Sequence, residues 1–268
     1  MTEQSRTSVL SDDQWAVLGP LIDECRGKTE PVALRETVEA MVWRHQNGAK
    51  WRSVPPDLVP WWRAAQTFIR WSKLGVWERL LERVQERGVD LGMAFLDGTS
   101  IRAHHKAAGA PKKGDLEPSA TCVRCLAALA AAMAPVWGEG PQALAGSPTA
   151  PAGRSASPGQ AHELPLAQDL VDCLPDVPGL GDKGYASHAF RQFIWDQGAR
   201  PAIPTRKNEA PVACPGWIYN NRNRVERLWA RLKEWRAVAT RYEKTARSFM
   251  GVLCLAAVFD WIKKDFKL

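Results

Sequence analysis

Apolar residues in the first 90 positions recur with the 3.6-residue period of an α-helix in four separate stretches. The first follows Ser11-Asp-Asp-Gln14, which has the spacing of a capping box and predicts a helix that continues to about Glu24. The other three helices are predicted over 33–46, which Gly48 ends, and over 61–71 and 76–87. The pattern therefore predicts an all-helical unit over residues 1–90.

The pattern changes after residue 90, where short apolar runs alternate with helical stretches. The run that starts at Gly92 and ends in Asp97 predicts a buried strand, and two further short strands are predicted over 180–182 and 199–204. Helices are predicted over 191–197, 219–236 and 245–264. Strands that alternate with helices indicate an α/β domain over residues 91–268.

One segment of this second domain has no strand-like pattern. Between Leu116 and Gln160 the chain has 12 alanines, 6 prolines and 5 glycines, but only four β-branched residues. This composition predicts a loop, then a short alanine-rich helix near 122–134, then a flexible stretch.

Charge and cysteine content narrow the class of protein. The chain has a formal net charge of +7, and residues 200–247 hold 12 basic against 4 acidic side chains, which suits a polyanionic partner. Only Cys122 and Cys125 form a C-x-x-C pair, so we expect reduced cytoplasmic thiols and no zinc site. The most apolar stretch, from Phe249 to Ile262, is too short to span a membrane and predicts a buried C-terminal helix.

Two carboxylates follow short predicted strands. Asp97 ends the first strand, and Asp182 ends the second. Taken singly, such a residue is most often a turn or a helix cap. Two strand-end carboxylates in one α/β domain can converge on a hard cation, because Mg²⁺ prefers oxygen ligands.

A polar stripe lies on the predicted helix over 219–236. Tyr219, Arg222, Glu226 and Lys233 fall at relative positions 0, 3, 7 and 14, which at about 100° per residue lie within roughly 60° of arc. A neighbouring apolar face would dock the helix and consists of Val225, Leu228, Trp229 and Leu232. The alternative is an ordinary solvated face in which an arginine and a glutamate pair at i,i+4.

Several motifs resemble the DDE transposases of the insertion-sequence-five group. They include FLDGTSIRAH over 95–104, SPGQAHELP over 157–165 and GDKGYASHAFR over 181–191. The family's Y-x2-R-x3-E-x6-K signature is filled without a gap from Tyr219 to Lys233. The stretch WRSVPP…GVWERLLE over 51–82 is similar to the family's helical DNA-binding region.

The resemblance implies an α/β, ribonuclease-H-like catalytic domain preceded by an all-helical, helix-turn-helix-like DNA-binding domain. It implies that Asp97, Asp182 and Glu226 are the catalytic carboxylates and bind two Mg²⁺ or Mn²⁺ ions for phosphodiester hydrolysis and strand transfer. It also leads us to expect that Arg222 and Lys233 grip phosphate and that Tyr219 lies near the cut strand.

The partners that the resemblance implies are double-stranded DNA, the terminal inverted repeats of the transposon and target DNA. A homo-oligomer on DNA and a nucleoid-associated cytoplasmic location in a bacterium are expected, with no membrane. On the glutamate helix, sequence-independent phosphate contacts are expected from Arg224, Arg227 and Arg231.

The helix over 61–71 is predicted to read a DNA groove through Arg63, Gln66 and Arg70. The alternative is that its aromatic residues Trp61, Trp62, Phe68 and Trp71 are simply core. His104 and His105 are interpreted as exposed loop histidines, although a place near DNA or metal stays open.

The resemblance breaks over 116–156. The family normally has two antiparallel strands and a G-R-S-x-G-G-Y-x-T-K stretch here, and similarity resumes at Ser157. Read in one shifted frame from GC-rich codons, Leu126 to Pro135 can give Gly-Arg-Thr-Gly-Arg-Gly-Tyr-Gly-Thr. We hypothesise that about 118–156 is out-of-frame translation, and we expect the central strands to be missing or disordered and the chain to have little or no activity.

Two other functions stay open at this point. One is a catalytically dead transposase relic that acts only as a DNA-binding protein. The other is a general metal-dependent nuclease with no preference for transposon ends.

Overall fold

The structure is a computed structural model that describes residues 9–27, 31, 33–86, 91–108, 122–132, 154–158, 167–168, 179–181, 183–214, 216–219 and 223–265. The chain forms two compact units. The helical unit comprises 1–85, 101–122 and 230–268, and the sheet unit comprises 86–100 and 123–229. The compact unit that holds the N-terminal helices therefore also includes the C-terminal segment, which the sequence-based boundary at residue 90 had assigned to the second domain.

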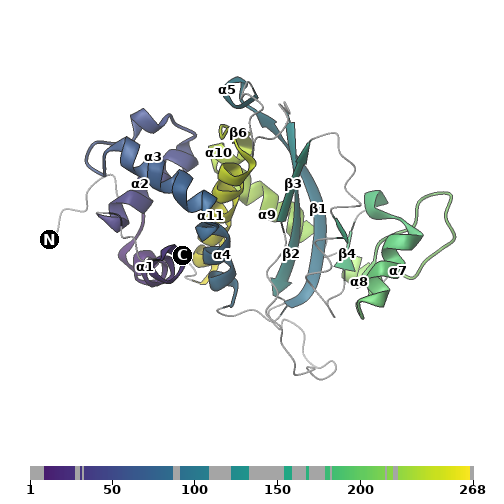
Figure 1. Ribbon diagram of the computed structural model, residues 1–268. Coiled ribbons are helices and arrows are strands. Elements are labelled where there is room, and N and C mark those ends of the chain that lie inside the picture. The colour runs from purple at the N-terminus through teal and green to yellow at the C-terminus, as the bar shows by residue number, and fades with distance from the viewer. Residues whose placement is uncertain are drawn as a thin grey trace. The chain divides into compact units, whose positions relative to one another are not determined.

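The four predicted N-terminal helices are present in the helical unit (Figure 1). They are α1 (Asp12–Arg26), α2 (Leu34–Asn47), α3 (Trp61–Lys73) and α4 (Val76–Glu86), with a short 3-10 turn η1 (Trp51–Ser53). The other elements of this unit are α5 (His105–Ala108), α10 (Arg236–Ala239), β6 (Thr240–Arg241) and α11 (Ala246–Asp265).

Local chemistry at the helix ends explains two of these boundaries. The Ser11 hydroxyl accepts from the backbone N–H of Gln14, and the Gln14 side chain accepts from the backbone N–H of Ser11, which confirms the capping box of α1. Gly48 ends α2 in the left-handed region at φ 59°, where its N–H donates to the carbonyl of Arg44. Both ends are set by residues that the sequence pattern identified.

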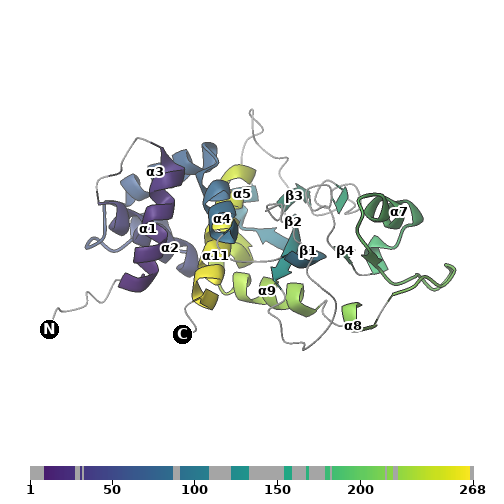
Figure 2. The ribbon, with the colours of Figure 1, turned by 90° about the horizontal axis from the view of Figure 1, so that it is seen from below.

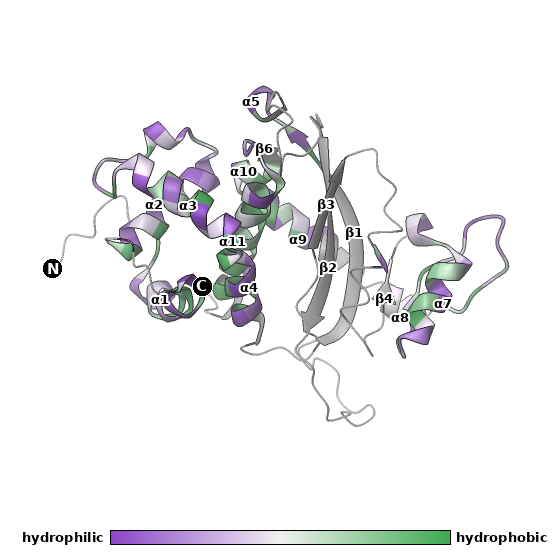
Figure 3. Ribbon diagram, in the orientation of Figure 1, coloured by the Kyte–Doolittle hydropathy of each residue, from purple (hydrophilic) through white to green (hydrophobic). Residues whose placement is uncertain are grey.

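Helix α11 is the core of the helical unit. It packs against α3, and every residue from Gly251 to Phe259 is buried, so this part of the helix is enclosed on all sides. Figure 3 colours much of α11 as hydrophobic. A Cβ on Gly251 would lie 2.7 Å from Ser72 Oγ and from Trp77 Cδ1, so α3 and α4 approach it closely. The prediction of a buried C-terminal helix is confirmed, and no helix in the described ranges meets the length and hydropathy needed to cross a membrane.

A buried ionic cluster joins α2 to the segment between β6 and α11. Arg44 Nη1 donates to the Glu243 carboxylate, and the two side chains are 7% and 6% exposed. The same nitrogen donates to Nδ1 of His45 at 2.8 Å. Burial and then the charge of Arg44 hold the pKa of His45 well below its usual value, so this imidazole is neutral. Arg241, which is 1% exposed, donates to the Glu243 carbonyl at 3.4 Å.

The sheet unit contains strands in the order β3-β2-β1-β4-β5. Figure 2 labels the first four of them. The strands are β1 (Leu91–Ala103), β2 (Cys122–Ala132), β3 (Arg154–Pro158), β4 (Gly179–Leu180) and β5 (Pro201–Ala202). Strands β1, β4 and β5 are mutually parallel, whereas β2 and β3 are antiparallel. The remaining elements that begin in this unit are η2 (Lys183–Tyr185), α7 (His188–Asp196), α8 (Gly216–Tyr219) and α9 (Asn223–Lys233).

The alanine-rich segment corrects the sequence analysis. The helix predicted near 122–134 is wrong, because residues 122–132 form β2 and pair with β3 from Val123↔Pro158 to Ala127↔Arg154. The expectation that the central strands are missing is likewise wrong for these two stretches, while 133–153 lie outside the described residues. Hydrogen bonds to neighbouring strands satisfy the backbone, and this tertiary context outweighs the weak strand preference of alanine.

The buried pair of Arg44 and Glu243 predicts an asymmetry in stability. Glu243→Gln leaves the Arg44 guanidinium buried without its counter-charge, so we expect a loss of about 3–5 kcal/mol in the free energy of unfolding. Asp23→Asn removes a carboxylate that is 53% exposed and lies 2.6 Å from Arg26, and serves as the control with an expected loss below about 1 kcal/mol. Urea denaturation followed by circular dichroism measures both, and equal losses would contradict the argument.

Candidate active site

Strand β1 carries the first predicted carboxylate. Asp97 does not end the strand, as the sequence analysis predicted, but lies in its middle, since β1 runs from Leu91 to Ala103. The strand continues because its last residues gain a further partner: Arg102 and Ala103 pair in parallel with β6. Ile101, four residues after Asp97 and so on the same face of β1, is fully buried.

Strand β4 lies beside β1 and leads to the second predicted carboxylate. The pairs Ala94↔Gly179 and Phe95↔Leu180 fix the parallel register, in which each residue of β4 faces the residue 85 positions earlier. Gly181 follows β4 and is buried, and a Cβ there would lie 3.1 Å from the ring of Tyr185. Asp182 itself lies outside the described residues.

Helix α9 carries the third predicted carboxylate. Glu226 is exposed in its first turn and Lys233 is half-buried at its end; seven residues correspond to about 700°, so both lie on one side. The predicted apolar docking face is confirmed for Leu228, Trp229 and Leu232, which are at most 6% exposed. The helix therefore presents Glu226 outward while its other side is packed.

The helix predicted over 219–236 is not one element among the described residues. Tyr219 is the last residue of α8, α9 spans 223–233 and α10 begins at Arg236. Arg222 lies outside the described residues, so the common face predicted for the four signature residues is observed only for Glu226 and Lys233. A turn at Glu234 and Trp235 separates α9 from α10, where Trp235 is buried.

The three arginines that were expected to contact phosphate on α9 differ in their surroundings. Arg227 is exposed. Arg231 makes two hydrogen bonds to the Asp260 carboxylate, at 2.5 and 2.9 Å, which raise its pKa. The guanidinium of Arg231 is thus paired with Asp260, whereas the exposed Arg227 can reach a ligand. The side chain of Arg224 lies outside the described residues.

Among the residues that the structure describes, no three His, Cys, Asp or Glu side chains lie close enough together to hold a metal ion. Asp182 and the side chain of Asp97 lie outside that description, so the set of three carboxylates stays a prediction.

Helix α3 has a buried aromatic side and an exposed polar side. Phe68 and Trp71 are core residues, whereas Trp61 and Trp62 are 37% and 47% exposed. Each exposed tryptophan has a guanidinium over its ring, from Arg52 at 5.4 Å and from Arg63 at 5.5 Å respectively. The interpretation of all four aromatics as core is therefore wrong for Trp61 and Trp62.

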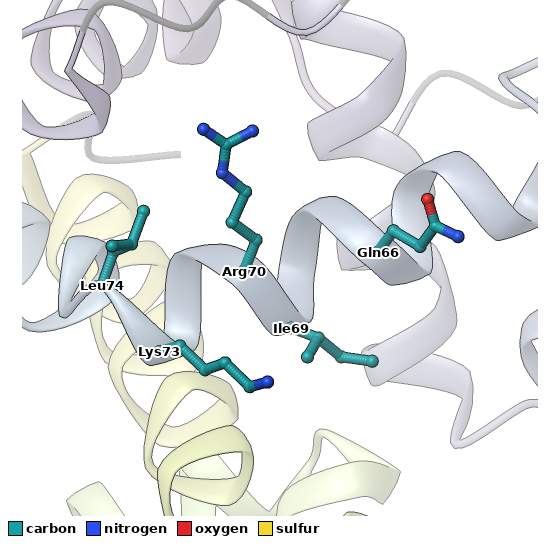
Figure 4. Close-up of a pocket in the computed structure, with 5 residues that line it drawn as sticks. All are labelled: Gln66, Ile69, Arg70, Lys73 and Leu74. Carbon is teal, nitrogen blue, oxygen red and sulfur yellow. The ribbon is translucent and has the colours of Figure 1, made fainter.

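A shallow hollow of about 480 Å³ lies on the exposed side of α3. Its lining residues, whose side chains extend outward from the helix in Figure 4, are Gln66, Ile69, Arg70, Lys73 and Leu74. Ile69 and Leu74 are 43% and 52% exposed, and no acidic residue lines the hollow. The surface combines two positive charges, an amide and exposed apolar groups, which suits the edge of a DNA groove.

The two histidines after β1 differ in their surroundings. His104 lies in the loop between β1 and α5, as predicted, but is half-buried rather than exposed, and its ring lies 5.2 Å from that of Tyr242. His105 is exposed and begins α5. A contact between residues 138 positions apart in the chain leaves no local signal in the sequence. The alternation of charged and aromatic side chains over Arg241, Tyr242 and Glu243 could still have indicated an extended segment.

Comparison with known proteins gives matches in both halves of the chain. Residues 10–81 match a family model described as "Putative transposase of IS4/5 family", and residues 180–263 match a model of the transposase DDE domain. An uncharacterised protein of Sinorhizobium fredii is 34% identical over 114 residues, which cover 41% of this chain and 90% of that protein. A Brucella ovis protein described as "Putative transposase for insertion sequence element IS6501" is 30% identical over 110 residues, 40% of this chain and 85% of that protein.

Proposed function

Because the chain belongs to the IS4/5 family of insertion-sequence transposases and contains a DDE transposase domain, we propose that it cuts and joins DNA at the ends of its element. The catalytic groups of this proposal are the carboxylates of Asp97, Asp182 and Glu226. The proposed fold of the catalytic domain is ribonuclease-H-like. Its support is a sheet in which two antiparallel strands, β2 and β3, follow the strand of the first aspartate and two parallel strands lie on its other side.

The β1–β4 register is the observation that carries the proposal. The offset of 85 positions in the two observed pairs equals the separation of Asp97 and Asp182 along the chain. The observed pair Phe95↔Leu180 lies two residues before Asp97 on one strand and two residues before Asp182 in the sequence. Two carboxylates that follow the same pair of adjacent strands could share hard divalent cations.

Glu226 supplies the third carboxylate. It is exposed on α9, which runs alongside the sheet in both views (Figures 1 and 2). The family model that matches 180–263 covers both this residue and Asp182. The proposed site therefore takes one carboxylate from β1, one from the residues after β4 and one from α9.

The proposed cofactor is a pair of Mg²⁺ or Mn²⁺ ions held by Asp97, Asp182 and Glu226. When bound, the ions lower the pKa of the attacking water or 3′-hydroxyl and stabilise the leaving oxygen of the phosphodiester. The protein's own part is to hold its carboxylates in a fixed register and to orient DNA. Arg227 and Lys233, on α9 with Glu226, are proposed to bind phosphates next to the cut bond, assisted by Arg222 and Tyr219.

The proposed partners are double-stranded DNA, namely the terminal inverted repeats and the target, bound by a homo-oligomer. Residues 1–90 are the proposed DNA-binding domain, with Arg63, Gln66 and Arg70 of α3 as the groove-reading residues. The observation behind this is the exposed, basic hollow on α3. A relic that binds DNA without cutting it is the outcome if binding is found and cleavage is not.

Glu226→Gln tests the catalytic assignment. The substitution removes one anionic ligand but leaves the docking face of α9 intact, so we expect Mg²⁺-dependent nicking to fall at least about a hundredfold while DNA binding persists. Glu234→Gln removes the same charge just after α9 and is the control, with activity near that of the wild type. The substrate is the DNA that borders the reading frame, and the readout is gel analysis of nicked product with Mg²⁺ or EDTA.

The result has a clear converse. If Glu226→Gln cuts this DNA as fast as Glu234→Gln and the wild type do, Glu226 is not a catalytic carboxylate. If none of the three proteins cuts but all bind the element ends, the chain is a DNA-binding relic.

Arg70→Ala and Gln66→Ala test the groove assignment. We expect each to weaken binding to the bordering DNA by about 1–3 kcal/mol and to reduce its advantage over a scrambled duplex, because a lost base contact lowers specificity. Arg83→Ala removes an exposed arginine from α4 instead and should affect both duplexes equally. Gel-shift titration measures the ratio; the same ratio in all variants would refute a reading role for α3.

The out-of-frame hypothesis for about 118–156 makes a prediction about the gene. Translation of its DNA in the two alternative frames should yield a Gly/Arg-rich, strand-like peptide in place of Leu126 to Pro135. Both alternative frames lacking such a peptide would end the hypothesis. Residues 122–132 and 154–158 nevertheless form β2 and β3, so this segment supplies two strands to the sheet.

A further inference from the structure

Three aromatic rings form a column in the helical unit, at the end of β1. The ring centroid of His104 lies 4.0 Å from that of His105 and 5.2 Å from that of Tyr242, with interplanar angles of 41° and 38°. We refer to His105, His104 and Tyr242 as the ring column. Tyr242 is half-buried and His105 is exposed, so the column opens to solvent at the His105 end.

The ring column is held rigidly. The backbone N–H of His104 donates to the Arg241 carbonyl at 2.9 Å, and its carbonyl accepts from Ala107 at 2.8 Å. The Nδ1 atom of its ring accepts from the backbone N–H of Lys106 at 3.3 Å. On the other side, a Cβ on Gly48 would lie only 3.1 Å from Tyr242 Cε2, so the end of α2 supports the tyrosine ring.

Four exposed cations lie within two residues of the column's rings in the chain or beside them in space, and we refer to them as the cation rim. Its members are Arg102, Lys106, Arg236 and Lys244. Arg102, the last but one residue of β1, and Lys106, in α5, each lie two residues from His104 in the chain. Arg236 lies beside Tyr242, since the same Cβ on Gly48 would lie 2.8 Å from Arg236 Cβ.

The segments that carry the ring column and the cation rim have almost no exposed negative charge. Residues 101–108 and 236–247 contain one acidic side chain, Glu243, which is buried and paired with Arg44. Partial burial, followed by the charges of His105 and Lys106, lowers the pKa of His104. An anionic ligand would relieve this repulsion.

We propose that the ring column and the cation rim form a binding surface for DNA with an unpaired nucleotide, whose base stacks on His105 while adjacent phosphates pair with the rim. Aromatic rings beside a track of cations are the chemistry by which proteins hold unstacked bases and their backbone. A purely acidic peptide would use the rim but gain nothing from an exposed ring. The inference rests on the proposed function for its partner, DNA.

The experiment compares two fluorescent probes with the full-length protein in EDTA, which prevents cleavage. One is a blunt 20-base-pair duplex of mixed sequence, and the other is the same duplex with a five-nucleotide 3′ overhang. Stacking of one base is worth roughly 5- to 150-fold in affinity, so we expect the wild type to prefer the overhang probe within that range. Fluorescence anisotropy gives both dissociation constants.

Single substitutions locate the preference. His105→Ala removes an exposed ring and should abolish the preference for the overhang without changing the affinity for the blunt duplex. His188→Ala removes an exposed histidine at the start of α7 and is the matched control that keeps the preference. Tyr242→Phe retains the ring and should behave as the wild type. Lys106→Ala should weaken both probes and reduce the salt slope by about one.

The outcomes separate the two proposals. If His105→Ala and His188→Ala prefer the overhang equally, or if the wild type has no preference, the ring column does not hold an unpaired base, although duplex binding would leave the proposed function standing. If the wild type binds neither probe, both proposals fail.

Discussion

The parallel register of β1 and β4 is the constraint on which the proposed site depends. Backbone hydrogen bonds fix the pairs Ala94↔Gly179 and Phe95↔Leu180, and with them the level at which every following residue meets its neighbour. A slip of one residue would turn the side chains of β1, Asp97 among them, to the opposite faces of the sheet relative to those of β4. The proposed site therefore requires strand pairing that cannot slip, and β1 pairs with several strands along its length.

The C-terminal segment ties the end of that strand to the helical unit. β6 pairs with Arg102 and Ala103, and two residues later Glu243 pairs with the buried Arg44 of α2. A buried pair of this kind adds little net stability over apolar packing, but it is costly to break and so defines one arrangement. The ion pair thus holds the chain just after β6 in one place relative to α2.

Local patterns in the sequence account for much of the helical unit. The capping box at Ser11, the left-handed Gly48 and the apolar face of α9 each act within a few residues, so each can be predicted without knowledge of the fold. The strand β2 could not be predicted, because its alanines favour a strand only when neighbouring strands complete its hydrogen bonds. Long-range pairing also explains why Asp97 was wrongly predicted to end its strand. The strand β6, which pairs with the last residues of β1, is about 140 positions away in the chain.

The candidate site divides in the same way. The spacing of Glu226 and Lys233 is a local helical property, whereas the proposed approach of Asp97 to Asp182 depends on the long-range pairing of β1 with β4, which the sequence shows only as a separation of 85 positions. Segment 241–244 shows both a local alternation of side chains and a long-range pairing with β1. Alternate residues of this extended segment face opposite ways, so Arg241 and Glu243 enter the buried cluster while Tyr242 and Lys244 remain at the surface. The ion pair inside thereby fixes where the tyrosine ring lies outside, because both belong to one short piece of backbone anchored at β6.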